Sequence, residues 1–322
     1  MIETRLTRAF DLTHPVISAP MARAGGGALA AAVTRAGGLG LIGGGYCDGD
    51  WIAEQFAAAG NEAVGCGFIT WRLTEVPGLL GEVLARRPSA VFLSFGDPAL
   101  FAGQIADAGM PLICQVQTLA DARLAAEAGA AVIVAQGAEA GGHGEGRATM
   151  TLVPEVADYL ARAFPEVLLV AAGGVADGRG LAAALMLGAD GVLVGSRFWA
   201  SDEALVHPNM LVAGVAATGD DTLRTSVVDV ARRLDWPERF TCRVLKNAFS
   251  ERWHGDLDGL LANAEAEAAR WGAAWEAGDV EVANSVVGEA VGLIDAVRPA
   301  GELVTSMVAG AEDLLGGGWR RI

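Results

Sequence analysis

The sequence predicts an α/β protein whose main body is a (β/α)8 TIM barrel. Over about the first 200 residues, short apolar runs rich in Val, Ile and Leu alternate with alanine-rich stretches of helical spacing. Continuous apolar strands that alternate with helices indicate a parallel sheet covered by those helices. Eight such units in a row favour a closed barrel, and a doubly wound open sheet is the alternative.

Eight apolar runs are expected to form the barrel strands. They span residues 15–20, 38–42, 63–69, 90–95, 111–116, 131–135, 167–172 and 191–195. The helices between them are expected at 28–36, 51–59, 76–86, 99–108, 119–128, 153–164 and 178–187. Recurrent phrases such as Ala36-Gly37-Gly38 and Leu187-Gly188-Ala189 place glycine just past a helix end, which indicates a repeated βα unit.

The strand pattern fades after residue 200, and the remainder is expected to be mainly helical. Helices are predicted at 223–233, 238–249, 256–275 and 299–315. We expect residues 1–200 to form the barrel and 201–298 to form a smaller domain on the substrate side. Residues 299–322 would then return as a C-terminal helix that packs on the barrel, where an eighth helix is needed.

The composition restricts the classes of partner. The chain has 322 residues and a net charge of −16, which disfavours nucleic acid and anionic membrane surfaces. No uninterrupted apolar stretch reaches 18 residues and the N-terminus lacks a signal pattern, so a cytoplasmic protein without a membrane span is expected.

The four cysteines have neither C-x-x-C nor zinc spacing, which predicts buried thiols and no metal site. A homo-oligomer is left open.

The loop after the sixth strand is the strongest candidate for catalysis. Active sites of such barrels lie at the carboxyl ends of the strands. Residues 136–146 contain five glycines and one histidine, and Gly141 and Gly142 would let the backbone approach a ligand closely. Gln136 can donate and accept hydrogen bonds at the edge of a flat ring. A lone histidine is more often structural, but His143 sits among glycines on the functional face and has a near-neutral pKa, which favours a functional role.

Two further glycine loops predict a phosphate-bearing ligand. Gly173 and Gly174 follow the seventh strand, and Gly195 and Ser196 follow the eighth. These loops expose backbone N–H groups, and a helix that begins near Gly178 would add its positive end. Either loop alone could be a simple tight turn. Together, at the two places where barrels commonly bind phosphate, they favour a ligand.

Other residues are expected to face the same space. In the loop after the first strand, which includes Ala19, Pro20 stiffens the turn and Met21 suits an aromatic face. Gln115 ends the fifth strand and is expected to point the same way. Arg23, Glu145 and Arg147 could face either the site or solvent, and the remaining histidines (His14, His207 and His254) are interpreted as structural or exposed.

These motifs resemble those of the nitronate monooxygenase family, long called 2-nitropropane dioxygenases. The resemblance is carried in order by Ile17-Ser18-Ala19-Pro20-Met21, Ala36-Gly37-Gly38-Leu39-Gly40, Gln136-Gly137-Ala138-Glu139-Ala140-Gly141-Gly142-His143, residues 171–180 and Gly195-Ser196-Arg197-Phe198. It implies an FMN-binding TIM barrel that oxidises alkyl nitronates with O2 to a carbonyl compound and nitrite.

The resemblance also implies roles for individual residues. His143 would be the catalytic acid/base group, and Gln136 would contact the flavin. The flavin phosphate would be held by Gly173, Gly174, Gly195 and Ser196, where Ser replaces a more usual Thr. One departure concerns the third strand: many members carry an Asn near the flavin there, whereas Gly65-Cys66-Gly67-Phe68 offers no amide side chain.

Neighbouring families share the same motifs and give the alternative functions. Flavin-dependent enoyl-acyl-carrier-protein reductases and NADH:quinone reductases look similar, so an NAD(P)H-dependent flavin reductase acting on quinones or enoyl thioesters is the second hypothesis. Residues 38–43 match the letters of a dinucleotide fingerprint but lie within an expected strand, which indicates a chance match. A barrel that binds a phosphorylated ligand without turnover is the third.

Overall fold

The computed structural model describes residues 2–321 and contains a closed barrel of parallel strands. The strands are β1 (Val16–Ser18), β2 (Leu41–Gly43), β3 (Gly65–Ile69), β4 (Val91–Ser94), β5 (Leu112–Val116), β6 (Val132–Gln136), β8 (Leu168–Ala172) and β9 (Gly191–Val194). Their order is β1-β9-β8-β6-β5-β4-β3-β2. A parallel bridge between Ile17 and Leu39 joins the two ends. The predicted barrel is therefore confirmed, and the open doubly wound sheet is excluded.

Helices cover the outside of the barrel and explain why its strands are apolar throughout. They are α2 (Gly27–Arg35), α3 (Gly49–Ala59), α4 (Thr70–Leu73), α5 (Leu79–Ala85), α6 (Ala99–Asp107), α7 (Leu119–Glu127), α8 (Thr149–Ala163) and α9 (Gly178–Met186). One face of each strand fills the barrel interior, as Ile113 and Val134 do. The other face packs under the helices, as Ile133 and Leu169 do. Both faces are dry, so each strand is a continuous hydrophobic run.

A short helix that the sequence did not predict lies at the amino end of the barrel. Helix α1 (Arg5–Phe10) places Leu6, which is fully buried, in the interior cluster. Arg5 donates two hydrogen bonds to the Asp190 carboxylate, at 2.9 and 2.7 Å, and so ties α1 to the start of β9.

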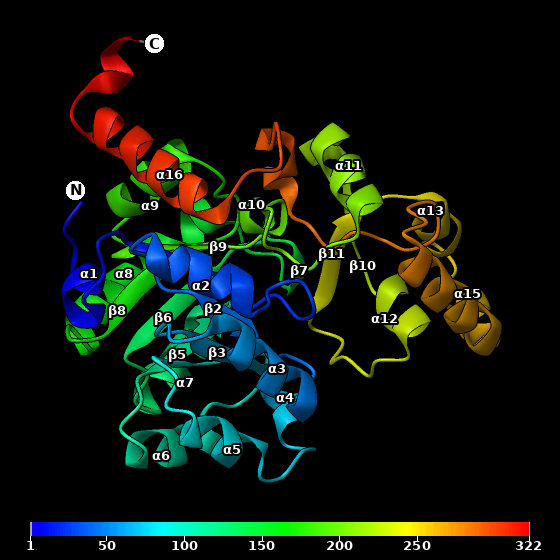
Figure 1. Cartoon of the computed structure of the whole chain (residues 1–322), viewed down its shortest axis with the longest axis horizontal. Helices are drawn as coiled ribbons and strands as arrows, with labels where there is room; N and C mark the ends of the chain where they lie inside the picture. The colour runs from blue at the N-terminus through cyan, green and yellow to red at the C-terminus, as the bar shows by residue number, and fades with distance from the viewer. Residues whose placement is uncertain (1, 322) are drawn as a thin grey trace.

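The last long helix occupies the place of the eighth barrel helix. Helix α16 (Ala300–Leu315) packs against α9 and α2, although more than 100 residues separate it from β9 (Figure 1). A Cβ atom at Gly178 would lie 2.5 Å from the backbone of Gly310 and Ala311, so α9 and α16 approach each other closely. The division of the chain near residues 200 and 299 stays a prediction.

Of the helices predicted in the second region, the one at 223–233 is confirmed only in part and the one at 238–249 is wrong, because strands occupy these stretches. Strands β10 (Thr222–Thr225) and β11 (Thr241–Leu245) stand where helices were expected at 223–233 and 238–249. They form an antiparallel sheet, β10-β11-β7, with β7 (Gly142–Gly144) from the barrel. Helix α12 (Val227–Arg232) begins only after β10. Strand β11 pairs with β7 almost 100 residues earlier in the sequence, so local spacing could not reveal this pairing.

The rest of this region is helical and has its own hydrophobic cluster. It comprises α10 (Ser196–Trp199), α11 (Pro208–Ala216), α13 (Ala248–Trp253), α14 (Leu257–Ala262), α15 (Ala264–Ala277) and the 3-10 turns η1 (Gly219–Asp221), η2 (Glu289–Leu293) and η3 (Gly318–Arg321). The helix expected at 256–275 is divided at Asn263. Trp199, Trp253 and Trp271 form the centre of the cluster. Of the helices within residues 2–321, none combines the length and the apolar character needed to cross a bilayer.

Candidate active site

A cavity of about 530 Å³ opens at the carboxyl ends of the barrel strands. It is lined by every residue that the sequence put forward for the site: Ala19, Pro20, Met21, Gln115, Gln136, Gly141, Gly142, His143, Gly173, Gly174, Gly195 and Ser196. These residues come from loops and strand ends between residues 19 and 196 of the chain. The structure thus brings the predicted set together, while the role of each member stays a prediction.

His143 belongs to strand β7 and does not lie in a glycine loop, as the sequence suggested. Its backbone pairs with Cys242 of β11. Its Nε2 atom lies 2.9 Å from Oδ1 of Asp229, which is on α12. The indole of Trp236 stacks on the imidazole with ring centroids 3.4 Å apart and an interplanar angle of 5°. Backbone, carboxylate and indole therefore fix the ring together.

The surroundings of His143 favour the neutral imidazole. Only 7 % of the side chain is exposed, and burial lowers the pKa of His143 below its ordinary value of about 6.5. The Asp229 carboxylate acts in the opposite direction, and the guanidinium groups of Arg232 and Arg224 add to the lowering. A histidine that is neutral near pH 7 can accept a proton from a bound molecule.

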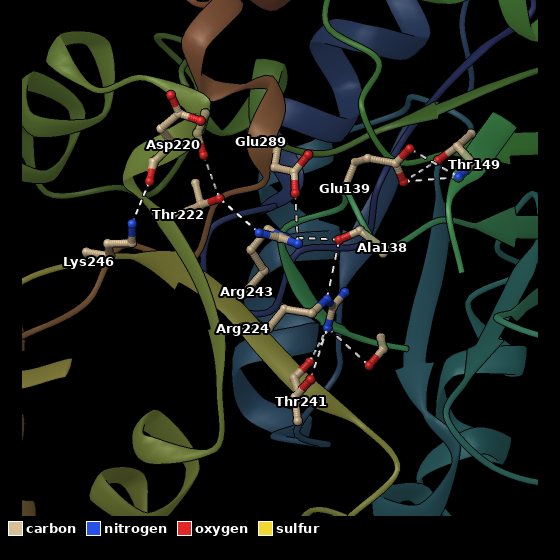
Figure 2. Close-up of polar contacts among 12 residues, drawn as sticks. Ala138, Glu139, Thr149, Asp220, Thr222, Arg224, Thr241, Arg243, Lys246 and Glu289 are labelled. Atoms are coloured by element: carbon tan, nitrogen blue, oxygen red, sulfur yellow. Dashed lines mark hydrogen bonds and ion pairs between the residues drawn. The ribbon is translucent and has the colours of Figure 1, made fainter. Parts of the chain in front are cut away.

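Two arginines brace the segment that carries His143 (Figure 2). Arg224 of β10 and Arg243 of β11 both donate to the carbonyl oxygen of Ala138, at 3.3 and 3.0 Å. Arg224 also donates to the carbonyl of Gly144 at 3.1 Å, and Arg243 pairs with Glu289 at 2.9 Å. The loop before and after His143 is therefore held at both ends by the second sheet.

The acidic residue of the same loop has a structural task. The Glu139 carboxylate accepts from the backbone N–H of Thr149 at 3.1 Å and from its hydroxyl at 2.9 Å (Figure 2). It therefore satisfies a free N–H group at the beginning of α8. This contact explains why α8 begins at Thr149 and not at residue 153, as its apolar spacing had suggested.

Three glutamine side chains meet beneath the cavity. The amide oxygen of Gln136 accepts from Nε2 of Gln115 at 3.1 Å and from Nε2 of Gln117 at 2.8 Å. Both lone pairs of that oxygen are used, so the NH2 group of Gln136 remains for a ligand. The expectation that Gln136 both donates to and accepts from the ligand is therefore corrected. Its amide oxygen is already occupied, and only its NH2 group can donate to a ligand.

The glycine loops provide backbone donors along one wall. Gly173 and Gly174 have φ angles of +102° and +76°, which turn the chain sharply after β8. Within the described chain, no acceptor takes the N–H of Gly174, Gly195 or Ser196. The Ser196 hydroxyl accepts from the N–H of Gly288 at 2.8 Å, so its own proton is free to donate. The arrangement suits an anionic group such as a phosphate.

The expected helix contribution to this phosphate site is wrong. The N-terminus of α9 is capped by the Asp177 carboxylate, which accepts from the N–H groups of Arg179 and Gly180. Gly178 contacts α16 and is absent from the cavity wall. A carboxylate that already occupies the positive end of a helix leaves no place there for a second anion.

The residues that follow β1 add apolar surface to the cavity. Met21 and Pro20 follow β1, and a Cβ atom at Gly67 would lie 2.4 Å from Cβ of Pro20. The Pro20 ring therefore fills the space that a side chain at position 67 would need, which accounts for the missing amide on β3. A wall of this kind suits the face of an aromatic ring system.

The comparison with known families agrees with the geometry. The sequence model of the family described as nitronate monooxygenase matches residues 3–62 and 76–310. The chain belongs to the nitronate monooxygenase family. Its members are oxidoreductases and in general depend on a flavin, so the resemblance seen in the motifs is confirmed.

Individual relatives of the nitronate monooxygenase family match over most of the chain. A nitronate monooxygenase of Neurospora crassa is 35% identical, with 94% of this chain and 91% of the relative covered. The nitronate monooxygenase npaC of Metarhizium robertsii is 37% identical, with 90% and 88% covered. The solved structure of FabK from Thermotoga maritima superposes with a TM-score of 0.87 at 29% identity and full coverage of both chains.

Several residues of this nitronate monooxygenase-family site escaped the sequence analysis. Asp229, Trp236, Phe95 and Gln117 contact the predicted residues, yet no local motif marks them. These residues are far from His143 or Gln136 in the sequence and meet them only in the fold.

The residues left open by the sequence are now placed. Arg23 lines the cavity, whereas Glu145 pairs with Arg239 and Arg147 pairs with Glu155 outside it. His207 caps α11 by accepting from the Asn209 N–H and also lines the cavity. All four cysteines are buried and free, and burial raises the pKa of Cys47, Cys66 and Cys114 to about 12.

Proposed function

We propose that this chain catalyses the FMN-dependent oxidation of alkyl nitronates by O2 to a carbonyl compound and nitrite. One observation carries the proposal: a buried, neutral histidine shares a single cavity with a cradle of unpaired backbone N–H groups. The names of the relatives from Neurospora crassa and Metarhizium robertsii support the same reaction.

The residues present fit FMN. The N–H groups of Gly174, Gly195 and Ser196 and the Ser196 hydroxyl would hold its phosphate. Pro20 and Met21 would lie against the ring system, and the NH2 group of Gln136 would donate to an acceptor on its edge. When bound, FMN supplies the electron transfer between the nitronate and O2.

The protein's own contribution is to prepare and shelter the substrate anion. His143 would remove the α-proton of a nitroalkane, or stabilise a nitronate once the imidazole is protonated. Trp236 and Phe95 surround the imidazole and keep water away from it. In a dry site, the attraction between an imidazolium and the nitronate oxygens is stronger than in water.

The direct test is nitrite release from an alkyl nitronate in air by purified protein with FMN bound. With a neutral nitroalkane as the substrate, His143→Gln should keep the FMN absorbance and lower the rate by about 10²–10⁴-fold, the usual contribution of proton transfer. His254→Gln is a matched control, because His254 contacts Thr225 outside the cavity. Flavin-loaded wild-type protein that releases no nitrite would contradict the function.

The same preparation tests the reductase alternative. Residues 41–43 of the dinucleotide-like stretch lie in β2, and a Cβ atom at Gly40 would lie 1.9 Å from the carbonyl oxygen of Ala30. These glycines therefore serve the packing of α2 on the barrel, and the stretch does not open a helix as a dinucleotide site requires. Anaerobic NADH or NADPH should bleach bound FMN slowly. Rapid bleaching would favour the reductase.

A further inference from the structure

The two nitrogen atoms of the His143 ring have different surroundings. Nε2 lies 2.9 Å from Oδ1 of Asp229. Nδ1 makes no hydrogen bond to any other residue of the described chain, and the side chain lines the cavity. An ionised carboxylate only accepts hydrogen bonds, so the nitrogen beside Asp229 must carry the proton.

We propose that Asp229 is a positioning residue that holds neutral His143 as its Nε2–H tautomer and so leaves Nδ1 as the base for neutral nitroalkanes. This assignment rests on the proposed function, which it deepens by naming the ring nitrogen that takes the α-proton of a nitroalkane and the residue that holds that nitrogen unprotonated.

Among the described residues, the Asp229 carboxylate has one hydrogen-bond partner, the His143 ring. Its side chain is 4 % exposed, and its second oxygen, Oδ2, has no hydrogen-bond partner. A purely structural buried carboxylate normally satisfies both oxygens, as Asp190 does with Arg5 and the N–H of Leu169. Asp229 lies in the first turn of α12, which begins two residues after β10 ends. The pairing of β10 in the second sheet therefore also fixes the position of the Asp229 carboxylate.

The proton and electrons of the step balance. The Nδ1 lone pair takes the α-proton of the nitroalkane, and the C–H electron pair becomes the C=N bond of the nitronate. Negative charge moves onto the two nitro oxygens, and the ring becomes an imidazolium that donates from Nε2 to Asp229. The carboxylate thereby stabilises the charge that forms, and the proton later leaves to solvent.

The first test is spectroscopic and needs no substrate. The ¹⁵N shifts of the His143 ring in FMN-loaded and FMN-free wild-type protein should show a protonated Nε2 and an unprotonated Nδ1. Nδ1–H as the main neutral tautomer would overturn the proposal, whether or not any variant folds. Asp229→Asn should change the ratio, because the new amide can donate to Nε2 and favour Nδ1–H.

The second test compares two forms of one substrate. Asp229→Asn should lower kcat/KM for the neutral nitroalkane by about 10²–10⁴-fold and leave turnover of the preformed nitronate within a few-fold. Asp229→Glu keeps a carboxylate and should restore part of the nitroalkane activity. Asp190→Asn is the matched control, a buried aspartate outside the cavity that should not alter the ratio of the two rates.

The pH profile supplies a readout that a merely structural role would not move. Charged and titratable groups around His143 are Asp229 and Arg232 of α12, Arg224 of β10, Cys242 of β11 and Tyr46. Burial raises the pKa of both Cys242 and Tyr46, so neither titrates near neutrality. The acidic limb of the nitroalkane profile therefore belongs to His143. It should move to lower pH in Asp229→Asn, because the carboxylate that raises the pKa of His143 is gone.

Failure of the two proposals can be told apart. Equal loss of nitroalkane and nitronate turnover in Asp229→Asn, with the tautomer unchanged, would overturn the role of Asp229 and leave nitronate oxidation intact in the wild type. Absence of nitrite from the nitronate in the wild type would overturn the function itself, independently of the tautomer.

Discussion

At the scale of single residues, Trp236 and Asp229 have opposite effects on the pKa of His143. The indole removes water from the ring and disfavours its charged form, whereas the carboxylate favours it. Desolvation is the stronger of the two, since the pKa of His143 is lowered overall. The imidazole is therefore unprotonated at neutral pH and can act as a base. Once it takes a proton, the Asp229 carboxylate stabilises the imidazolium.

Removal of the indole should shift this balance. We expect Trp236→Ala to raise the pKa of His143 toward or above 6.5, because water regains access while Asp229 stays in place. An NMR titration of the His143 ring proton measures the shift. Trp51→Ala, on α3 outside the cavity, is the control and should leave the titration unchanged. A lower pKa in Trp236→Ala would show that burial is not the main cause.

The same change should alter how stability depends on pH. The folded pKa of His143 lies below the unfolded value, so the unfolded chain binds more protons as pH falls below about 6.5. Folding stability contributed by the neutral ring is therefore complete above that pH and is lost as pH falls through the folded pKa. Trp236→Ala should flatten this acid-side loss.

At the scale of elements, the second sheet links the barrel to the region that carries Asp229. Strand β7 is only Gly142–Gly144, and its hold on β11 depends on Arg224 and Arg243 at either side. We expect Arg224→Met to destabilise this pairing by about 1.5–3 kcal/mol, the usual contribution of a charged hydrogen bond. Amide hydrogen exchange at His143 and Gly144 should accelerate accordingly.

A surface arginine provides the comparison for that experiment. Arg298 pairs with Asp295, and both side chains are largely exposed, so Arg298→Met should change stability by at most about 1 kcal/mol. It should not alter exchange in β7. Equal exchange at His143 in wild type and Arg224→Met would mean that the backbone ladder with β11 suffices without the arginine brace.

These elements also mark how far local sequence patterns reach. All eight barrel strands could be predicted because each is buried on both faces and reads as an apolar run. The loops at their ends could be predicted because glycines cluster just after the strands, in one case around a single histidine. Strand β7, by contrast, is Gly-His-Gly and has no strand propensity of its own. Its partner β11, and β10 beyond it, are short and carry arginines, so their strand character depends on their pairing and not on an apolar run.

At the scale of the whole molecule, the ring of helices is completed by a segment from the far end of the chain. Helix α16 closes the gap beside α9, and the intervening residues supply Asp229, Trp236 and the braces of the histidine strand. The segment between β9 and α16 therefore serves two purposes: it contributes residues to the site, and it leads to the helix that completes the ring around the barrel. A defect in the α9–α16 contact should reduce global stability and leave the chemistry of His143 unchanged.

A pair of glycines can test this separation. A Cβ atom at Gly178 would lie 2.5 Å from the backbone of α16, so Gly178→Ala must push the two helices apart and should cost about 1–3 kcal/mol of unfolding free energy. At Gly301, also in α16, the nearest atom to a new Cβ is the Ala36 Cβ at 3.7 Å, so Gly301→Ala should be neutral or slightly stabilising. Urea unfolding measures both. A Gly178→Ala variant that unfolds at the wild-type urea midpoint would show that the close approach of α9 and α16 does not limit stability. A shift of the His143 titration in this variant would show that the α9–α16 contact and the site are coupled.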